Sequence, residues 1–216
     1  MIIKQILVGQ MAVFCYLIGC EATRQAMVID PAGDEEYVLQ TAREMNLEIK
    51  YIFNSHGHPD HTCGNARMKE LTGAAIVMQA RDDDVFNRRT GSQGSGAWGF
   101  TPSPPADIRL EDEKTFEMGE ITFQIIYTPG HTPGGLCLLA DGQLFSGDIL
   151  FVGSGGRTDL PGGSLPTMLK SIKTLMDLPD ETVVWPGHDY GMAPTSTIGR
   201  EKRTNMYVLE FDLLEA

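Results

Sequence analysis

The sequence predicts a mixed α/β (α+β) fold in which two β-sheets pack face to face and helices cover their outer sides. Short apolar runs separated by turns recur through the chain, and helical spacing appears only in a few segments between them. A strand meander followed by mixed strands and helices also occurs twice. No linker separates the two halves, and 216 residues suffice for one core. We therefore expect a single domain over residues 1–216.

The first half of the chain is expected to contribute five strands and two helices. A helix is predicted over Gly33–Met45 because Val38, Ala42 and Met45 fall on one face. A second helix is predicted over Asn65–Leu71. The strands are predicted from apolar runs bounded by turn residues, at Ile2–Val8, Ala12–Ile18, Ala26–Ile29, Ile49–Phe53 and Ala74–Met78.

The segment from Gln79 to Asp112 has no sustained period, so we expect a long irregular loop at about 79–112. It contains the acidic run Asp82–Asp84, a Gly/Ser stretch at 91–96 and several prolines. A long irregular segment in a compact domain is usually a functional or a mobile loop. We favour a lid or a substrate wall over a disordered insertion.

The second half repeats the pattern of the first. Strands are predicted at Ile121–Tyr127, Leu136–Ala140, Gln143–Ser146 and Thr182–Trp185. A glycine-rich loop at Gly153–Gly163 precedes a helix over Ser164–Leu178, for which Ser164 is the expected N-cap. The expected buried stripe of that helix is Leu165, Leu169, Ile172 and Met176, and a last helix is expected over Ile198–Leu209.

The composition restricts the partners and the compartment. A net charge of −12 repels phosphate backbones and anionic lipid surfaces, so neither a nucleic acid nor a membrane is an expected partner. No leader segment is visible, and the four cysteines form no CxxC pair. We therefore expect a cytoplasmic protein with reduced thiols. Cys63 is either a buried small residue or a neighbour of the metal centre described next.

All five histidines follow the ends of predicted strands. His56, His58 and His61 follow the strand that ends at Phe53, and His131 and His188 each follow a later strand. Asp60 lies within the first group, and Asp148 follows another strand in the same way. Packing gives no reason to crowd three imidazoles and a carboxylate into six residues, because imidazoles repel when protonated and need partners when buried.

A bound cation supplies that partner, so the sequence predicts a metal site. Residues two apart in an extended stretch point the same way, so His56 and His58 can bind one ion. Adjacent Asp60 and His61 diverge and can reach a second ion. Imidazole and carboxylate ligands without thiolate suit zinc first, with iron or manganese as alternatives, and are not typical of a closed structural zinc site.

The pattern H-x-H-x-D-H, followed by a distant His, Asp and His, resembles the metallo-β-lactamase superfamily. The resemblance extends to Asp30 and to the turns before His131, Asp148 and His188, and it covers nearly the whole chain. It implies a four-layer αββα sandwich with two divalent metal ions at one edge of the sheets. The first ion is then expected on His56, His58 and His131, the second on Asp60, His61 and His188, and Asp148 is expected to bridge them.

Within the superfamily the chain resembles the glyoxalase II (hydroxyacylglutathione hydrolase-like) group. Three segments carry this resemblance: Gly155–Asp159, His188–Tyr190, and Pro194–Ile198 with Glu201 and Asn205. It implies hydrolysis of a small-molecule thioester, an S-acylglutathione or a related acyl-thiol. Similar pieces occur in persulfide dioxygenases, where a single iron would correspond to His56, His131 and Asp148. A non-enzymatic metal-binding module is the third alternative.

The expected mechanism follows from charge. Two divalent ions carry four positive charges, and Asp60, Asp148 and a bridging hydroxide carry three negative charges. The net charge of about +1 lowers the pKa of metal-bound water towards ~7. Asp60 and Asp148 are the expected catalytic residues. Tyr190 and Arg157 are the candidates for substrate binding, and a surface salt bridge is the alternative for Arg157. Asp30 and Asp189 are the candidates for orienting the imidazoles.

Overall fold

The structure, a computed structural model, describes residues 1–88 and 99–214 and contains two six-stranded sheets. The first sheet has the order β1-β2-β3-β4-β5-β6 and consists of β1 (Ile2–Val8), β2 (Val13–Gly19), β3 (Gln25–Ile29), β4 (Glu48–Phe53), β5 (Ala75–Gln79) and β6 (Ile108–Leu110). The second has the order β12-β11-β10-β9-β8-β7 and consists of β7 (Thr115–Met118), β8 (Ile121–Tyr127), β9 (Leu136–Ala140), β10 (Gln143–Gly147), β11 (Val183–Pro186) and β12 (Ser196–Thr197).

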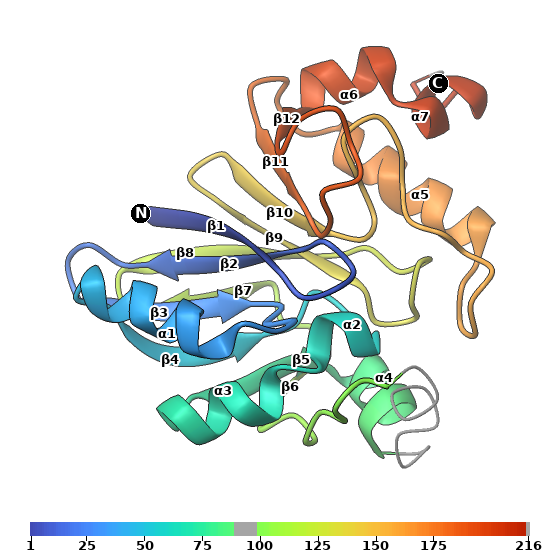
Figure 1. Cartoon of the computed structure of the whole chain (residues 1–216). Coiled ribbons are helices and arrows are strands. Elements are labelled where there is room, and N and C mark those ends of the chain that lie inside the picture. The colour runs from blue at the N-terminus through green and yellow to red at the C-terminus, as the bar shows by residue number, and fades with distance from the viewer. Residues whose placement is uncertain (89–98, 215–216) are drawn as a thin grey trace.

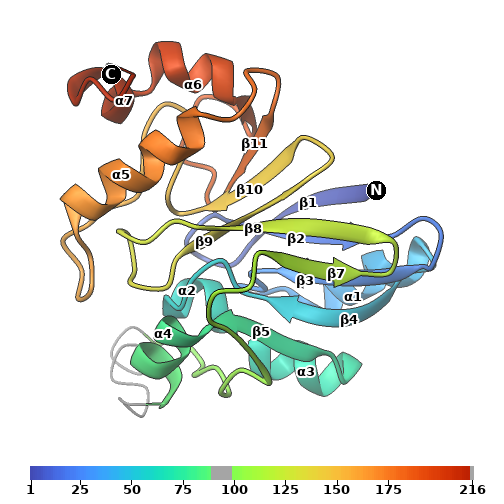
Figure 2. The same cartoon turned by 180° about the vertical axis from the view of Figure 1, so that it is seen from behind.

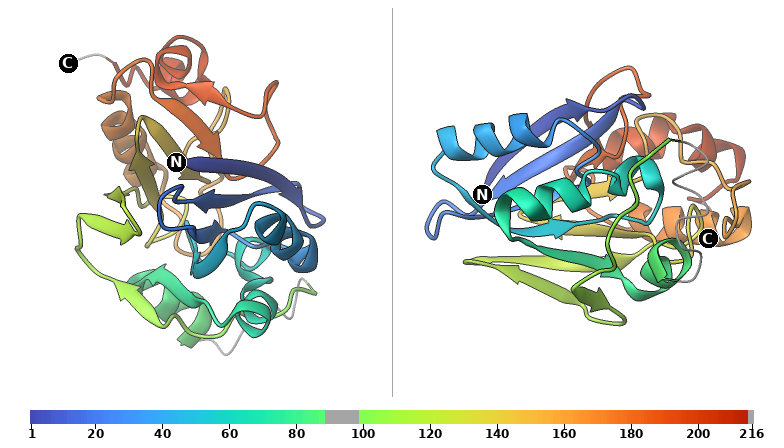
Figure 3. Two further views of the ribbon diagram at one scale, coloured as in Figure 1. Left: turned by 90° about the vertical axis from the view of Figure 1, so that its left-hand side faces the viewer. Right: turned by 60° about the horizontal axis from the view of Figure 1, so that its bottom comes forward.

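Helices cover the outer sides of both sheets (Figures 1 and 2). Helices α1 (Glu35–Glu44) and α3 (Asn65–Thr72) pack on the first sheet, and α5 (Leu165–Met176), α6 (Ile198–Thr204) and α7 (Met206–Glu210) pack on the second. The side views in Figure 3 show the same separation of helices and sheets. The predicted four-layer αββα arrangement is confirmed.

Strand β2 shows how the layers are held together. Its residues alternate between two cores: Phe14, Tyr16 and Ile18 point into the core between the sheets, whereas Cys15 and Leu17 point toward the helices. Because successive side chains on a strand point to opposite faces, a strand buried on both faces reads as a continuous apolar run. Every residue of β2 is buried, as that rule requires.

The segment from 79 to 112 is more regular than predicted. It contains α4 (Ala80–Asp82), a turn of π-helix labelled η1 (Asp83–Arg88), and β6. These elements are too short to show a period in the sequence. Part of the expected lid, residues 89–98, lies outside the described residues.

Two predicted helices need correction. The N-cap of α5 is confirmed, since the Ser164 hydroxyl accepts from the Thr167 amide, but the buried face is centred on Met168, Ile172 and Leu175. The helix expected over Ile198–Leu209 is two helices. Asn205 has an extended backbone and caps α7 by accepting from the Tyr207 amide, which breaks the run.

The topology brings several strand ends to one edge of the sandwich. Strands β3 and β4 are parallel in the first sheet, and β10 and β11 are parallel in the second. Ligands in open sheets of this kind bind outside the carboxyl ends of the strands. Within residues 1–88 and 99–214, every helix is too short or too polar to cross a bilayer.

Candidate metal centre

The seven predicted ligands come together at this edge, although they derive from four separate parts of the chain. They are contributed by the loop after β4 with the short helix α2 (Pro59–Thr62), the loop after β8, the end of β10 and the end of β11. Six of the seven side chains are buried, and Asp60 is half-buried. The structure therefore forms the cluster that the histidine spacing suggested.

The segment His56–His61 is not extended throughout, as the sequence argument assumed. His58 is the N-cap of α2, Pro59 occupies its first turn, and the His61 amide donates to the His58 carbonyl. Proline is well suited to a first helical turn because its missing N–H would have no partner there. The helical turn places the His61 ring beside the His56 ring, with centroids 4.2 Å apart, and places Asp60 Oδ2 3.8 Å from His61 Nε2.

Three imidazoles form what we call the first half-site: His56, His58 and His131. His56 Nε2 lies 3.1 Å from His58 Nδ1, and His58 Nδ1 lies 2.8 Å from His131 Nε2. The rings of His58 and His131 meet edge to face. Three ring nitrogens thus converge on one point.

Asp60, His61 and His188 form the second half-site. The Nε2 atoms of His61 and His188 are 3.0 Å apart. Asp60 Oδ2 lies 3.6 Å from His188 Nε2 and 3.8 Å from His61 Nε2. This grouping matches the second predicted set.

Asp148 lies between the half-sites. Its Oδ2 is 3.5 Å from His131 Nε2 and 3.3 Å from His188 Nε2, and its Oδ1 is 3.4 Å from His61 Nε2. Among the described residues its buried Oδ1 atom has no hydrogen-bond partner. A Cβ at Gly187 would lie 2.2 Å from that atom, so only glycine fits between β11 and this carboxylate.

The outer ring nitrogens fix the tautomers. His131 Nδ1 donates to the Arg157 carbonyl at 2.7 Å, and His188 Nδ1 donates to the Met11 carbonyl at 2.8 Å. His61 Nδ1 donates to Asp30 at 2.9 Å. Since these outer nitrogens carry the hydrogen, each Nε2 presents a lone pair to the centre.

Of the two orienting residues that we predicted, only Asp30 has that role. Asp30 is buried and also accepts from the Ser55 amide and hydroxyl. Asp189 is exposed, and the Met11 carbonyl orients His188 in its place. The prediction for Asp189 was wrong because the orienting atom comes from the turn between β1 and β2.

The electrostatics differ between the half-sites. Burial, followed by the charge of His131, lowers the pKa of His58 to about 3, and burial holds the pKa of His56 well below its ordinary value. Burial also acts to lower the pKa of His61, but Asp148, Asp60 and Asp30 outweigh it and raise that pKa well above the ordinary value. His61 and His188 in turn hold the pKa of Asp148 well below its usual range, against the effect of burial.

The arrangement fits a pair of divalent cations. In the first half-site, lone pairs of neutral imidazoles that face one another at about 3 Å repel unless a cation lies between them. The unpartnered Asp148 Oδ1 points to the same missing partner. Imidazole and carboxylate donors without thiolate suit zinc, iron or manganese.

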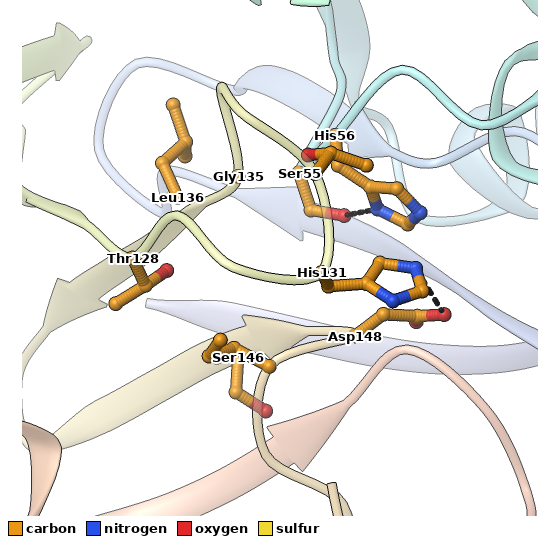
Figure 4. Close-up of a pocket in the computed structure, with 10 residues that line it drawn as sticks. Ser55, His56, Thr128, His131, Gly135, Leu136, Ser146 and Asp148 are labelled. Carbon is orange, nitrogen blue, oxygen red and sulfur yellow. Dashed lines mark hydrogen bonds and ion pairs between the residues drawn. The ribbon is translucent and has the colours of Figure 1, made fainter. Parts of the chain in front are cut away.

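A small pocket adjoins the centre and is shown in Figure 4. His131 and Asp148 lie side by side on one wall, and Ser55 contacts His56 at 3.0 Å. Thr128 and Ser146 belong to the lining as well, at the ends of β8 and β10. Polar residues thus outnumber apolar residues in the pocket lining next to the first half-site.

The two predicted substrate-binding residues lie at the rim. Tyr190 stacks on His188 with ring centres 4.4 Å apart and planes at 8°, and its hydroxyl donates to the Met11 carbonyl. The Arg157 guanidinium is exposed and forms a bidentate pair with Asp159 at 2.7 Å. In Cys63, burial raises the pKa of the thiol to about 11, and Sγ contacts the Asp60 carbonyl rather than the centre.

Two groups that support the centre were not predicted from the sequence. The Met11 carbonyl has no sequence signal, because any residue carries one. Asp82 could have been noticed as an acidic residue soon after a buried strand, but the run Asp82–Asp84 resembled a solvated surface. Its carboxylate is fully buried.

Comparison with known proteins identifies the family. The sequence profile of the Metallo-beta-lactamase superfamily matches residues 8–188. The hydroxyacylglutathione hydrolase GloC of Haemophilus influenzae is 33% identical over 203 residues, covering 90% of this chain and 92% of GloC. The mitochondrial persulfide dioxygenase ETHE1 of Homo sapiens is 29% identical over 202 residues, covering 89% of this chain and 70% of ETHE1.

Among solved structures, TTHA1623 in a di-iron-bound form superposes with a TM-score of 0.81 at 32% identity, covering 94% of this chain and 99% of that one. The profile match spans both half-sites, from the β1–β2 turn to His188. The chain therefore belongs to the metallo-beta-lactamase superfamily.

Proposed function

We propose that this protein is a metal-dependent thioester hydrolase of the glyoxalase II type, acting on an S-acylglutathione or a related acyl-thiol. The observation that carries the proposal is the presence of two equally elaborated half-sites that share Asp148. Each half-site has its own groups that orient the imidazoles from behind. A pair of ions would use both sets. The 33% identity to GloC supports the same activity.

The seven ligands would hold two divalent ions, zinc first, with iron or manganese as alternatives. When bound, such a pair makes hydroxide available near neutral pH and polarises a carbonyl. The chain's own residues then have three tasks: to fix the lone pairs of the imidazoles, to exclude bulk water, and to exchange protons with solvent. Asp60 suits the last task, because its side chain is 20% exposed whereas the other ligands are buried.

The rim of the centre would receive the substrate. Aromatic rings lie on two flanks, with Tyr190 stacked on His188 and Phe86 against the edge of His58 at 5.3 Å. These rings suit an apolar acyl chain or a thioether. Arg157 would bind a substrate carboxylate only by releasing Asp159. The exposed pair is weak enough for such an exchange.

Persulfide dioxygenase activity is the second candidate. The identity of 29% to the human enzyme supports it, and so does the close approach of His131 and Asp148, two of the three residues expected to hold its single iron. The two candidates differ in metal content and in the second substrate. A hydrolase needs only water, whereas a dioxygenase consumes oxygen.

Metal analysis and two assays separate these candidates. Protein purified without added metal is expected to contain close to two metal ions per chain and to release thiol from S-lactoylglutathione. Asp148→Asn should abolish that release. Asp141→Asn is the matched control: Asp141 is exposed in the turn between β9 and β10 and has a positive φ that asparagine tolerates, so activity should not change.

Two other outcomes would contradict the proposed hydrolase. One iron per chain, with oxygen uptake on glutathione persulfide and no thiol release from thioesters, would establish the dioxygenase. Two bound metals without activity on any thioester would reject the proposed hydrolase.

A further inference from the structure

Asp82 is a fully buried carboxylate that contacts no predicted metal ligand side chain. It lies in α4, directly behind the centre. Its Oδ2 accepts from the Gly57 amide at 2.8 Å and from the Thr132 hydroxyl at 2.6 Å, and its Oδ1 accepts from the Gly134 amide at 2.6 Å. Three donors of this kind match a carboxylate, which only accepts.

The donors belong to two loops that are far apart in the sequence. Gly57 lies between His56 and His58, and Thr132 directly follows His131. These two loops carry every imidazole of the first half-site. The Asp82 carboxylate therefore accepts hydrogen bonds from both loops. The separation of these loops sets the distances between the imidazoles of the first half-site.

Close packing reinforces the tie. A Cβ on Gly134 would lie 2.7 Å from Asp82 Oδ1, and a Cβ on Gly57 would lie 2.3 Å from the Phe86 ring. Phe86 belongs to the next turn after Asp82 and also packs against the His58 ring. The backbone of both loops thus rests directly on the segment that begins at Asp82.

We propose that Asp82 is a positioning residue for the first half-site, which holds the loop of His56 and His58 and the loop of His131 at the separation that one metal ion requires. The inference rests on the proposed metal centre and deepens it. Asp82 acts through backbone amides and a hydroxyl, and it touches neither the ion nor the substrate.

The second half-site does not depend on this tie. Asp60 and His61 lie on α2, and His61 is oriented by Asp30. His188 is oriented by the Met11 carbonyl. Loss of the Asp82 carboxylate should therefore weaken metal binding at the first half-site selectively.

The neighbouring Asp83 provides a matched control. It is also fully buried, and it accepts from Arg88, Arg109 and the Ala106 amide. Its partners lie in η1, at Ala106 and in β6, and none lies on a histidine loop. Asp83→Asn removes the same charge one residue away and loosens the same segment.

The test is a Co²⁺ titration of the full chain in two backgrounds. His188→Ala leaves the first half-site intact and His58→Ala leaves the second. Asp82→Asn keeps the volume but places an amide N–H₂ group against at least one donor. We expect it to weaken Co²⁺ binding about 10- to 100-fold in the His188→Ala background and less than about 3-fold in the His58→Ala background. Asp83→Asn should leave the ratio of the two affinities unchanged.

Thr132→Val supplies a milder variant if Asp82→Asn does not fold. It removes one of the three hydrogen bonds, and a smaller weakening confined to the first half-site is expected. Equal weakening at both half-sites, or the same pattern for Asp83→Asn, would reduce Asp82 to a structural residue and overturn the inference. A chain that binds no Co²⁺ before these variants are introduced would instead reject the metal centre itself.

Discussion

The two half-sites use similar ligands but have different surroundings. In the first, the orienting acceptors are neutral: the Ser55 hydroxyl beside His56 and the Arg157 carbonyl behind His131. In the second, the Asp30 carboxylate lies behind His61, and Asp60 is itself a ligand. The difference shows that two neighbouring half-sites can differ in charge because different groups accept hydrogen bonds from the outer nitrogens of their imidazoles.

This charge difference decides how protons compete with the metal. The pKa of His58 is lowered to about 3 by burial and by His131, so in neutral solution no proton has to leave that ring. His61 is the reverse case, because three carboxylates raise its pKa despite burial. Metal binding must then displace a proton from His61 at the second half-site but none from His58 at the first.

Single-histidine variants should produce the largest effects. His58→Ala is expected to remove the first metal and His188→Ala the second, so metal content should fall from two to one in each. If hydrolysis needs both ions, each variant should lower kcat/KM for a thioester by about 10³-fold. Metal analysis and thiol release on the same samples would check this.

The requirement for both half-sites would be refuted if only one of the two variants lowered kcat/KM. Full thiol release by His188→Ala with one metal bound would make the second half-site dispensable for hydrolysis, and it would contradict a mechanism that needs both ions. Asp141→Asn again serves as the control for handling and stability.

Acidification should separate the half-sites by about 100-fold between pH 7 and pH 5. A site that must release one proton loses affinity ten-fold for each pH unit below the pKa of that group. Because the pKa of His61 is raised, metal affinity at the second half-site should fall between pH 7 and pH 5. The pKa of His58 is about 3, so His58 should not gain a proton over the same range. Co²⁺ titrations should therefore show a steeper pH dependence in the His58→Ala background than in the His188→Ala background. A flat response in both backgrounds would contradict the assigned charges.

The features that could be predicted from the sequence depend on neighbours in the chain. The continuous apolar run of β2 and the position of each histidine after a strand are local signals. They sufficed for the layered fold and for the seven clustered side chains. They did not suffice for β6, whose three residues show no period, nor for the break at Asn205.

The features that could not be predicted depend on contacts between distant segments. The Met11 carbonyl reaches His188 because Val13 forms an isolated bridge with His188. Likewise, Asp82 is buried only because the loops of Gly57 and Gly134 close over it. Neither contact leaves a local pattern. The outer support of a site is therefore harder to predict than its ligands.

Asp30→Asn should weaken the second half-site about 10- to 100-fold and leave the first nearly unchanged. Asparagine tolerates the positive φ of 51° at this position, but both Asp30 oxygens accept hydrogen bonds, so the substitution removes the charge and also places an N–H₂ group against a donor. Without the carboxylate, the Nδ1 hydrogen of His61 loses its anionic acceptor, and the ring becomes a weaker ligand. Co²⁺ affinity in the His58→Ala background measures the loss. An equal loss in the His188→Ala background would show that Asp30 supports both half-sites through Ser55.

Tyr190 should give the smallest effect, and its two variants separate the ring from the hydroxyl. Tyr190→Phe keeps the ring stacked on His188 and removes only the bond to the Met11 carbonyl, which His188 Nδ1 still occupies. An exposed hydrogen bond of this kind contributes little, so kcat and KM should change less than about 3-fold. Tyr190→Ala uncovers one face of His188 and should raise KM more than Tyr190→Phe does. A loss of about 100-fold in Tyr190→Phe would mean that the hydroxyl acts on the substrate, because removing it leaves the stacked face of the second half-site unchanged.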